Sequence, residues 1–251
     1  MLRILTASLL LGLAAPAFAD AAASFRDGKW AESIKEGRAE ATGTSLTIAG
    51  RAQLVAASAF TDKAAAKAAI DAAQRDFEAA LVKAPNSGEA AIQRAIALGY
   101  RAKLDRSPGE AKATRQAMEA VLAKDPNNAL ANAALGGWHG GAIATLGGFL
   151  AGSVLGASRS ASERYFATAM AREPRNIIHP VTYAFTLLDL DPDNGPKAAT
   201  LLRGAVALPV RDAYDTQNRK GAAAVLALLD KGDARGARTL AKRIQPFGMV
   251  G

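Results

Sequence analysis

The sequence predicts an all-helical protein built from repeated helical hairpins, and three observations lead to this prediction. Half of the 251 residues are hydrophobic, yet only 6% are aromatic and alanine dominates the apolar set. Alanine is the strongest helix former, whereas the β-branched and aromatic runs typical of strands are scarce. One spacing of small and bulky residues also recurs four times and ends at a proline each time. Such repetition indicates a chain of similar helical units.

The first 19 residues have the three parts of a secretory signal peptide. Arg3 supplies the positive charge, residues 4–13 form an uncharged apolar run, and residues 17–19 give the small-x-small pattern of a cleavage site. This run is too short to span roughly 30 Å of hydrocarbon, which takes about 20 residues, and no cysteine is present to carry a lipid. We therefore expect cleavage after Ala19, a periplasmic or secreted protein, and one repeat domain over residues 20–251.

Each repeat has a small or polar residue, a bulky apolar residue four positions later, a small residue three later and a proline five later. These steps of four and three keep the first three side chains on one helix face. The proline then ends the helix, because it has no N–H to donate. The four predicted sets are Ala73-Phe77-Ala80-Pro85, Thr114-Met118-Val121-Pro126, Ser162-Phe166-Ala169-Pro174 and Lys197-Leu201-Gly204-Pro209.

Residues 62–210, which contain these sets, resemble the tetratricopeptide repeat (TPR), whose second helix carries the same small–bulky–small–Pro pattern. The resemblance implies a right-handed solenoid of helical hairpins whose concave face binds a protein or peptide. The prolines lie 41, 48 and 35 residues apart, against about 34 for a regular repeat. The first two excesses equal about two and four helical turns. We therefore expect irregular repeats with lengthened helices.

The remaining elements follow from the same periodicity and from turn residues. A helical hairpin broken at Asp27-Gly28 is expected over residues 20–41, and the turn Ser107-Pro108-Gly109 should precede a helix over 110–124. Further helices are expected over residues 45–60, 62–84, 89–104, 129–155, 159–172, 180–190, 196–207, 212–230 and 234–244.

Residues 126–158, called here the uncharged segment, contain no Asp, Glu, Lys or Arg. Glycines recur every four residues within it, which permits close approach of a neighbouring helix. We expect one long interior helix with two faces. The bulky face would hold Ile143, Leu146, Leu150 and Val154, and the smooth face would hold Gly141, Gly148, Gly152 and Gly156. Peripheral contact with a lipid or membrane surface, and a membrane-spanning helix, remain as alternatives.

Residues 135–139 within this segment, Leu-Gly-Gly-Trp-His, are similar to a motif in the TPR-like domain of the regulator of microtubule dynamics proteins. Some members of that family handle phospholipids. The chain is similar to the same degree to the TPR accessory subunits of periplasmic solute transporters. These short resemblances leave the ligand open.

Motifs for catalysis, cofactors or metals are absent from the sequence. The two histidines, His139 and His179, have no partner at a helical spacing suited to a metal, and the chain has no cysteine. We expect a capping or surface role for His179. Residues 189–195 resemble the start of a calcium loop but have Thr200 where that loop needs glutamate. We therefore predict no catalytic, metal or cofactor site and a protein that is not an enzyme.

If a ligand groove exists, the first helix of each repeat should line it. The alternative is that these side chains are solvated arginines and packed aromatics. The candidates are Gln93, Arg94, Tyr100, Arg101, Trp138, His139 and Tyr183.

Charge gives a weaker indication of the partner. Removal of Arg3 with the leader lowers the formal net charge from +8 to +7, which favours anionic partners. The basic residues form no dense stripe and lack interleaved aromatics, so a nucleic-acid partner is not expected. A protein or peptide partner is the leading hypothesis, a lipid or apolar small molecule carried at a membrane surface is the alternative, and the oligomeric state is open.

Overall fold

The computed structural model describes residues 20–250, and all regular structure in this range is helical. The predicted signal peptide lies outside the described residues. The all-α fold class is confirmed. The helices are α1 (Ala21–Arg26), α2 (Trp30–Glu40), α3 (Gly43–Ala57), α4 (Lys63–Lys83), α5 (Gly88–Asp105), α6 (Pro108–Lys124), α7 (Ala129–Leu146), α8 (Gly148–Leu150), π-helix η1 (Ala151–Leu155), α9 (Arg159–Arg172), α10 (Ile178–Leu190), 3-10 turn η2 (Pro192–Asn194), α11 (Gly195–Val206), α12 (Ala213–Asp230) and α13 (Ala234–Ile244).

Most helices begin at a polar side chain that caps their free N–H groups. Thr42 and Ser45 form a reciprocal capping box at the start of α3. Ser107 caps α6, so Pro108 and Gly109 form its first turn and not the preceding loop as predicted. Proline is favoured there because its missing N–H would have no helical partner. Other side-chain caps are Asp20, Asp62, Ser87, Asn128, Ser158, Asp212 and Asp233.

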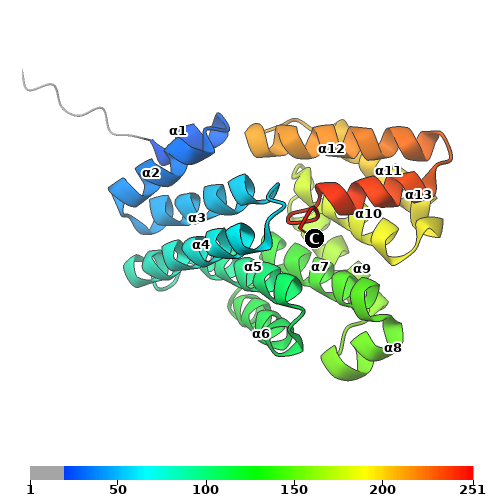
Figure 1. Ribbon diagram of the computed structural model, residues 1–251, viewed down its shortest axis with the longest axis horizontal. Helices are drawn as coiled ribbons and strands as arrows, with labels where there is room; N and C mark the ends of the chain where they lie inside the picture. Colours follow the sequence, from blue (N-terminus) through cyan, green and yellow to red (C-terminus); the bar gives the residue numbers. More distant parts are fainter. Residues whose placement is uncertain (1–19, 251) are drawn as a thin grey trace, which may run out of the picture.

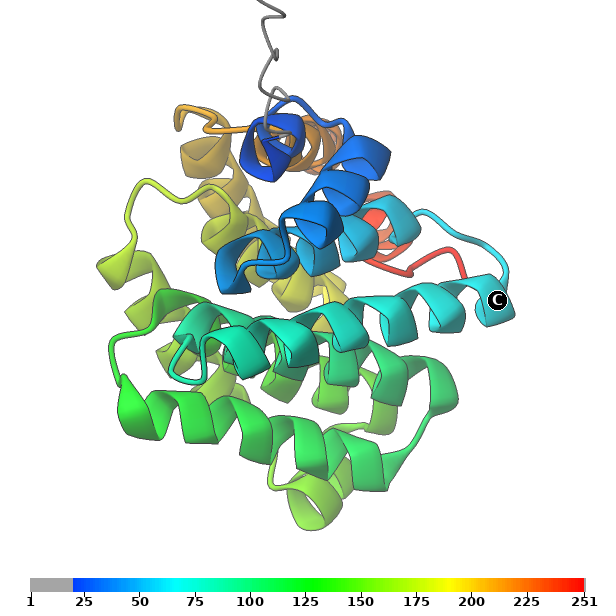
Figure 2. The ribbon, with the colours of Figure 1, turned by 90° about the vertical axis from the view of Figure 1, so that its left-hand side faces the viewer.

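Successive helices pack side by side as hairpins, α3 with α4, α5 with α6, α10 with α11 and α12 with α13, and α7 packs in the same way with α9 beyond the intervening α8 and η1. Neighbouring hairpins then join through α4 and α5, α6 and α7, and α11 and α12 (Figures 1 and 2). The two ends of the described chain also meet, because α1 contacts α12 and the Phe247 N–H donates to the Ser58 carbonyl just after α3. No described helix is long and apolar enough to cross a membrane.

The side chains of the first three predicted sets, apart from the prolines, are buried in the structure. Ala73, Phe77 and Ala80 are buried on α4, and the corresponding positions on α6 and α9 are buried as well. Their prolines are exposed and follow each helix by two residues. Phe77 packs against Gly50 of α3, where an added Cβ would lie 2.5 Å from the ring. The corresponding buried residues are Thr114, Met118 and Val121 on α6, and Ser162, Phe166 and Ala169 on α9.

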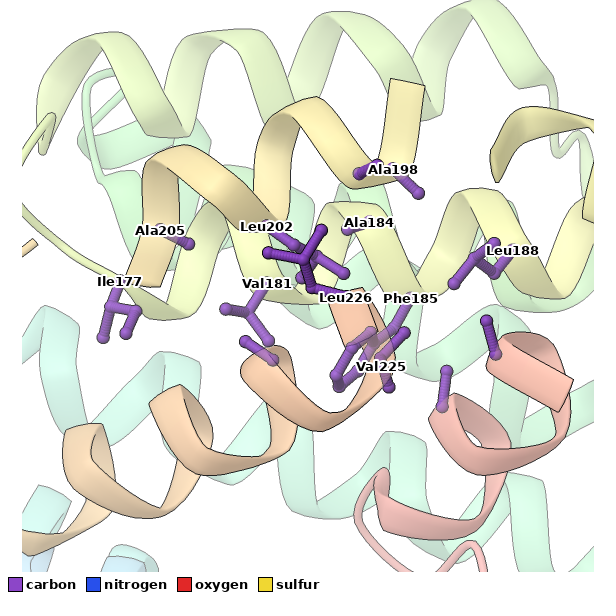
Figure 3. Packing of buried hydrophobic residues seen from close by; sticks show 14 residues of the cluster. Ile177, Val181, Ala184, Phe185, Leu188, Ala198, Leu202, Ala205, Val225 and Leu226 are labelled. Atoms are coloured by element: carbon purple, nitrogen blue, oxygen red, sulfur yellow. The ribbon is translucent and has the colours of Figure 1, made fainter. Parts of the chain in front are cut away.

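The predicted register of the fourth repeat is wrong by one residue. On α11 the buried residues are Ala198, Leu202 and Ala205, whereas Leu201 is only half-buried. The predicted Lys197 and Gly204 are exposed. α11 ends at Val206, three residues before Pro209, whereas the earlier prolines follow their helices by two. Counting back from Pro209 therefore misplaced the set. Figure 3 shows Leu202 between α10 and α12, within a core that includes Ile177, Val181, Phe185, Leu188, Val225 and Leu226.

The single long helix predicted over residues 129–155 does not form. α7 ends at Leu146, the following Gly147 adopts φ of +77°, and the chain continues into α8 and η1. The extra residues between Pro126 and Pro174 therefore form an insertion between α7 and α9. They do not lengthen the two helices of the hairpin. Residues 147–156 are called the protrusion below, and Figures 1 and 2 place α8 at the edge of the molecule opposite α1 and α12.

The predicted smooth glycine face is wrong at three of its four positions, and only Gly156 lies close to a neighbouring helix, where an added Cβ would lie 2.6 Å from Arg115 of α6. A Cβ added at Gly141 or Gly148 would meet no atom within 4 Å, and one at Gly152 would meet only the Ala157 carbonyl, at 3.7 Å. The close approach occurs instead at Gly136, where a Cβ would lie 2.7 Å from Phe166, and at Gly140, where it would overlap the Thr186 methyl group.

Candidate functional site

The predicted groove residues on α5 are held by the neighbouring helix. Arg94 is exposed and pairs with Glu78 of α4 at 3.1 Å. Arg101 pairs with Asp71 of α4 and, at 3.0 Å, with Asp105. Hydrogen bonds from Lys67 and Arg101 hold the pKa of Asp105 below its usual value. The two arginines therefore connect α5 to α4 and do not line a common groove.

Tyr100 is covered by the C-terminal segment, residues 245–250. The Tyr100 and Phe247 rings lie 5.1 Å apart, and Phe247 is 2% exposed within the apolar cluster of α3, α4 and α5. The Phe247 N–H donates to the Ser58 carbonyl at 2.9 Å. Burial raises the pKa of Tyr100, so the phenol is neutral at physiological pH. The surface next to Tyr100 is therefore occupied by another part of the same chain.

Trp138 and His139 form an aromatic cluster at the junction of α6, α7 and α9. The indole N–H of Trp138 donates to the Ala111 carbonyl at 3.0 Å. His139 is buried, stacks on Tyr165 at 5.6 Å and accepts the Ser158 N–H at Nδ1. Burial, followed by the nearby charge of Arg115, lowers the pKa of His139 to about 4. The imidazole is therefore neutral at pH 7, and its hydrogen bond fixes the start of α9.

Tyr183 is buried on α10 and stacks on Phe166, with ring centroids 4.7 Å apart. Its hydroxyl donates to Glu163 at 3.4 Å, and Lys197 lies 5.3 Å from the ring centroid. Tyr183 thus belongs to the core between α9 and α10.

The candidate groove residues occupy three separate packing sites along the chain, as in the alternative of solvated arginines and packed aromatics. Each aromatic member fills space between helices, and each arginine is held by a carboxylate. The amide of Gln93, which is also buried, donates to Glu89 of the same helix at 3.1 Å.

His179 lies in the first turn of α10, as expected, but it is 1% exposed and not at the surface. Its Nε2 lies 2.9 Å from a Glu173 carboxylate oxygen, which also accepts from Asn176. Asn176 in turn accepts from Arg211, which forms a two-pronged pair with the buried Asp215. Burial is the first cause of a lowered pKa at His179.

This polar network connects the start of α10 to the start of α12, and the sequence analysis missed it. Its members are up to 42 positions apart, from Glu173 to Asp215, and share no local spacing. The Arg211-x-x-x-Asp215 spacing was its only sequence signal, and such pairs occur on many solvated helices.

No site for a metal or an apolar ligand emerges from the described residues. No three His, Asp or Glu side chains between residues 20 and 250 gather in an arrangement that would hold a metal ion. Two surface hollows are open to solvent and include charged side chains. One is lined by Arg26, Val210, Arg211, Asp212, Ala213 and Thr216, and the other by Glu89, Asp125, Asn127, Asn128, Ala129, Leu130, Arg172 and Glu173.

The protrusion is the most conspicuous apolar feature of the surface. Phe149 is 86% exposed, and Leu150 and Val154 are 51% and 43% exposed beside it. Leu146, the last residue of α7, is 37% exposed. Large apolar side chains that cluster in solvent mark a site of interaction more often than isolated ones do.

Comparison with known proteins gives no family assignment: no protein-family model matches the chain, and no curated protein matches it. The two candidate sites are therefore defined by geometry alone. They are the surface of α3, α4 and α5 that holds the C-terminal segment, and the protrusion.

Proposed function

We propose that this protein is an exported, non-catalytic binding protein whose TPR-like hairpins form a right-handed solenoid that binds a protein or peptide partner. Support for a repeat architecture comes from the packing of consecutive hairpins. In two of them a glycine of the first helix receives an aromatic ring of the second: Gly50 receives Phe77, and Gly136 receives Phe166. In the hairpin between them the contact differs, because an added Cβ at Gly99 would lie 3.1 Å from Thr114 and 4.0 Å from Met118, the bulky residue of that set.

The observation that carries the peptide-binding proposal is the docking of the C-terminal segment. Phe247 enters the cluster formed by Leu54, Ala97 and Leu104, while its backbone N–H pairs with Ser58. An irregular peptide is thus held by one buried aromatic anchor and one main-chain hydrogen bond. Phe247 adopts φ of +58°, a conformation that costs an aromatic residue roughly 1–2 kcal/mol. A partner peptide without this strain would compete for the same surface.

The test is to remove the C-terminal segment from the surface of α3, α4 and α5 and to supply it as a separate peptide. A variant truncated after Ile244 should bind a fluorescent peptide of residues 245–251, measured by anisotropy, whereas the full chain should bind it at least about tenfold more weakly, because its own segment competes. A peptide with Phe247→Ala is the matched control and should not bind. Equal binding of both peptides, or no binding by a truncated protein that retains its helical circular dichroism, would contradict the proposal.

Export is tested separately. N-terminal sequencing of protein recovered from the periplasmic fraction should begin at Asp20, as expected for cleavage after Ala19. Protein that retains Met1 in the cytoplasm would contradict the proposed location without affecting the peptide test.

The alternative function, carriage of a lipid or apolar small molecule, needs an enclosed apolar cavity. The two surface hollows contain charged side chains and are open, so neither favours that function. Contact with a membrane surface needs no cavity, and a different observation bears on it.

A further inference from the structure

We propose that the protrusion is a docking element for anionic lipid surfaces, into which Phe149, Leu150 and Val154 insert. This inference is independent of the proposed peptide binding, because the protrusion and the C-terminal segment lie in different parts of the molecule. It rests on the shape of the protrusion, on the apolar side chains it exposes and on the charges around it.

The protrusion is a built structure with two different sides. Gly147 and Gly156, with φ of +77° and +68°, turn the chain out of α7 and back towards α9. On the inner side Ala151 and Leu155 are buried, and the Ala157 N–H donates to the Ala151 carbonyl at 3.0 Å. The outer side carries the exposed apolar residues. The protrusion thus presents them from a fixed base.

Arg115 of α6 fastens this base to the body of the protein. Its guanidinium donates to the Leu155 carbonyl at 3.0 Å and to the Gly156 carbonyl at 3.4 Å. The same side chain pairs with Glu119 at 2.7 Å, which balances its charge. These bonds satisfy two carbonyl groups at the end of η1, so that the segment is held without covering its outer side.

The exposed residues contribute little to the stability of the fold, because they remain in solvent. Phe149 is the most exposed large apolar residue between residues 20 and 250. The two residues on either side of it offer no charge, since the uncharged segment extends from 126 to 158. A soluble loop normally carries polar side chains at such positions. Contact with an apolar phase outside the protein would account for the absence of polar side chains beside Phe149.

A lipid surface suits the protrusion better than a second protein does. A stable protein interface takes about 800 Å² and 20–30 residues from each partner, which is more than a ten-residue excursion can present. Insertion of a few apolar side chains into the boundary between head groups and acyl chains needs no such area. The outer side also has no charged side chain with which to recognise a specific protein surface.

The charges around the protrusion favour an anionic lipid. Arg159 begins α9 three residues after Gly156, and Lys112 lies one helical turn before Arg115, the residue that bonds to the protrusion; both are exposed and form no ion pair with any described residue. Of the carboxylates on α6 and α9, Glu119 and Glu163 are paired, with Arg115 and Lys197 respectively, whereas Glu110 forms no ion pair with any described residue. Together with a formal charge of +7 after loss of Arg3, these cations would attract negatively charged head groups to the same side of the protein.

The experiment uses the protein from Asp20 onward and vesicles of phosphatidylcholine, alone or mixed with phosphatidylglycerol. Co-sedimentation should show binding to the mixed vesicles and much weaker binding to phosphatidylcholine. Phe149→Asp should weaken the binding by about tenfold or more, the effect of losing one inserted aromatic side chain. Val82→Asp is the matched control, because Val82 is 79% exposed on α4, outside the protrusion, and it should leave binding unchanged.

A second measurement locates the contact. The chain has no cysteine, so Phe149→Cys and Val82→Cys each create one site for an environment-sensitive fluorophore. Mixed vesicles should shift the emission at position 149 to the blue and leave position 82 unaffected. Both positions are exposed, so equal melting temperatures of the variants will show that the fold is retained.

Three outcomes would overturn the proposal: no binding of the parent protein to the mixed vesicles, an equal loss of binding in Phe149→Asp and Val82→Asp, or a blue shift at both labelled positions. Dimers in size-exclusion chromatography that dissociate on Phe149→Asp, without vesicle binding, would assign the protrusion to a second copy of the chain. Failure of this test would leave the peptide-binding proposal untouched.

Discussion

α7 and the protrusion are adjacent, rich in glycine and free of formal charge, yet they meet opposite environments. In α7, Gly136 and Gly140 lie against Phe166 and Thr186 with no room for a methyl group. In the protrusion, Gly148 faces open space, and Phe149 extends into solvent. Glycine in one case permits helices to approach and in the other permits the chain to turn away. The spacing of glycines therefore does not reveal their role, because the role depends on the neighbouring element.

The largest expected effect compares one phenylalanine from each environment. Phe166→Ala should lower the free energy of unfolding by about 3–5 kcal/mol, because it empties a fully buried aromatic site. Phe149→Ala should change it by less than about 0.5 kcal/mol, as is usual for exposed positions. Urea unfolding of both variants measures the difference. Similar losses would mean that the protrusion packs against the body of the protein.

Phe77→Ala extends the comparison to another hairpin. Phe77 is also fully buried and packs against Gly50 as Phe166 packs against Gly136. A loss of about 3–5 kcal/mol is expected in the same urea experiment. A much smaller loss would show that the two hairpins are not equivalent units.

Adjacent glycines of α7 provide a sharper comparison. A methyl group at Gly140 would overlap Thr186, whose position is fixed by its hydroxyl bond to the Thr182 carbonyl. Gly140→Ala should therefore destabilise the protein by about 1–3 kcal/mol. Gly141→Ala has open space and should stabilise it by about 0.8–1.0 kcal/mol, the helix preference of alanine over glycine. Thermal and urea unfolding should give shifts of opposite sign, and shifts of the same sign would contradict the described orientation of α7.

His139 of α7 accepts a hydrogen bond from Ser158, which follows the protrusion by two residues, and makes this contact sensitive to pH. Its pKa is about 4 in the folded protein against an ordinary value of 6.5, so the unfolded chain takes up a proton first as the pH falls. Stability is therefore lost between pH 6.5 and 4, by about 1–2 kcal/mol at pH 5 after allowing for solvent screening. Protonation also removes the acceptor for the Ser158 N–H.

The measurement is urea unfolding at pH 7 and pH 5, with His139→Gln as the comparison. Glutamine retains a hydrogen-bond acceptor but does not titrate. The loss of stability between pH 7 and pH 5 should therefore be smaller in the variant than in the parent, by about 1–2 kcal/mol. If parent and variant respond to pH equally, other groups carry the dependence and His139 is not buried in a neutral form.

The sequence predicted the helical class, most helix positions and three of the four repeat cores, because these depend on local periodicity. Ala73, Phe77 and Ala80 share a face by spacing alone. On α11 two adjacent leucines, Leu201 and Leu202, fit the pattern equally by type. Only the length of the loop before Pro209 separates them, and no local rule gives that length.

The packing partners of the candidate groove residues could not be predicted from the sequence, for a different reason. Tyr100 is of a residue type that often contacts ligands, but Phe247, which lies 147 positions away in the sequence, covers it. Arg94 and Arg101 share a helix face, as predicted from their spacing, and that face meets carboxylates on α4. Such contacts between distant segments are a result of the tertiary fold, and one sequence without its fold does not specify them. The end of α7 before Gly147 could not be predicted either. The residues around Gly147 include other glycines as well as good helix formers, so no local feature distinguishes this glycine from the rest.

The smallest expected effect tests the corrected position of Gly152. An interior helix face would make any added side chain at this position unfavourable, since overpacking a close contact typically costs about 1–3 kcal/mol. In the structure a Cβ there meets only the Ala157 carbonyl, at an ordinary contact distance of 3.7 Å. Gly152→Ala should then raise stability by a few tenths of a kcal/mol. That is less than the 0.8–1.0 kcal/mol typical of a helix interior, because η1 has only five residues. Urea midpoints of the two proteins, measured side by side at equal slope, resolve a shift of this size. A lower midpoint for Gly152→Ala would mean that the protrusion packs against a neighbouring helix in solution, and the exposed position of Phe149 would then have to be reconsidered as well.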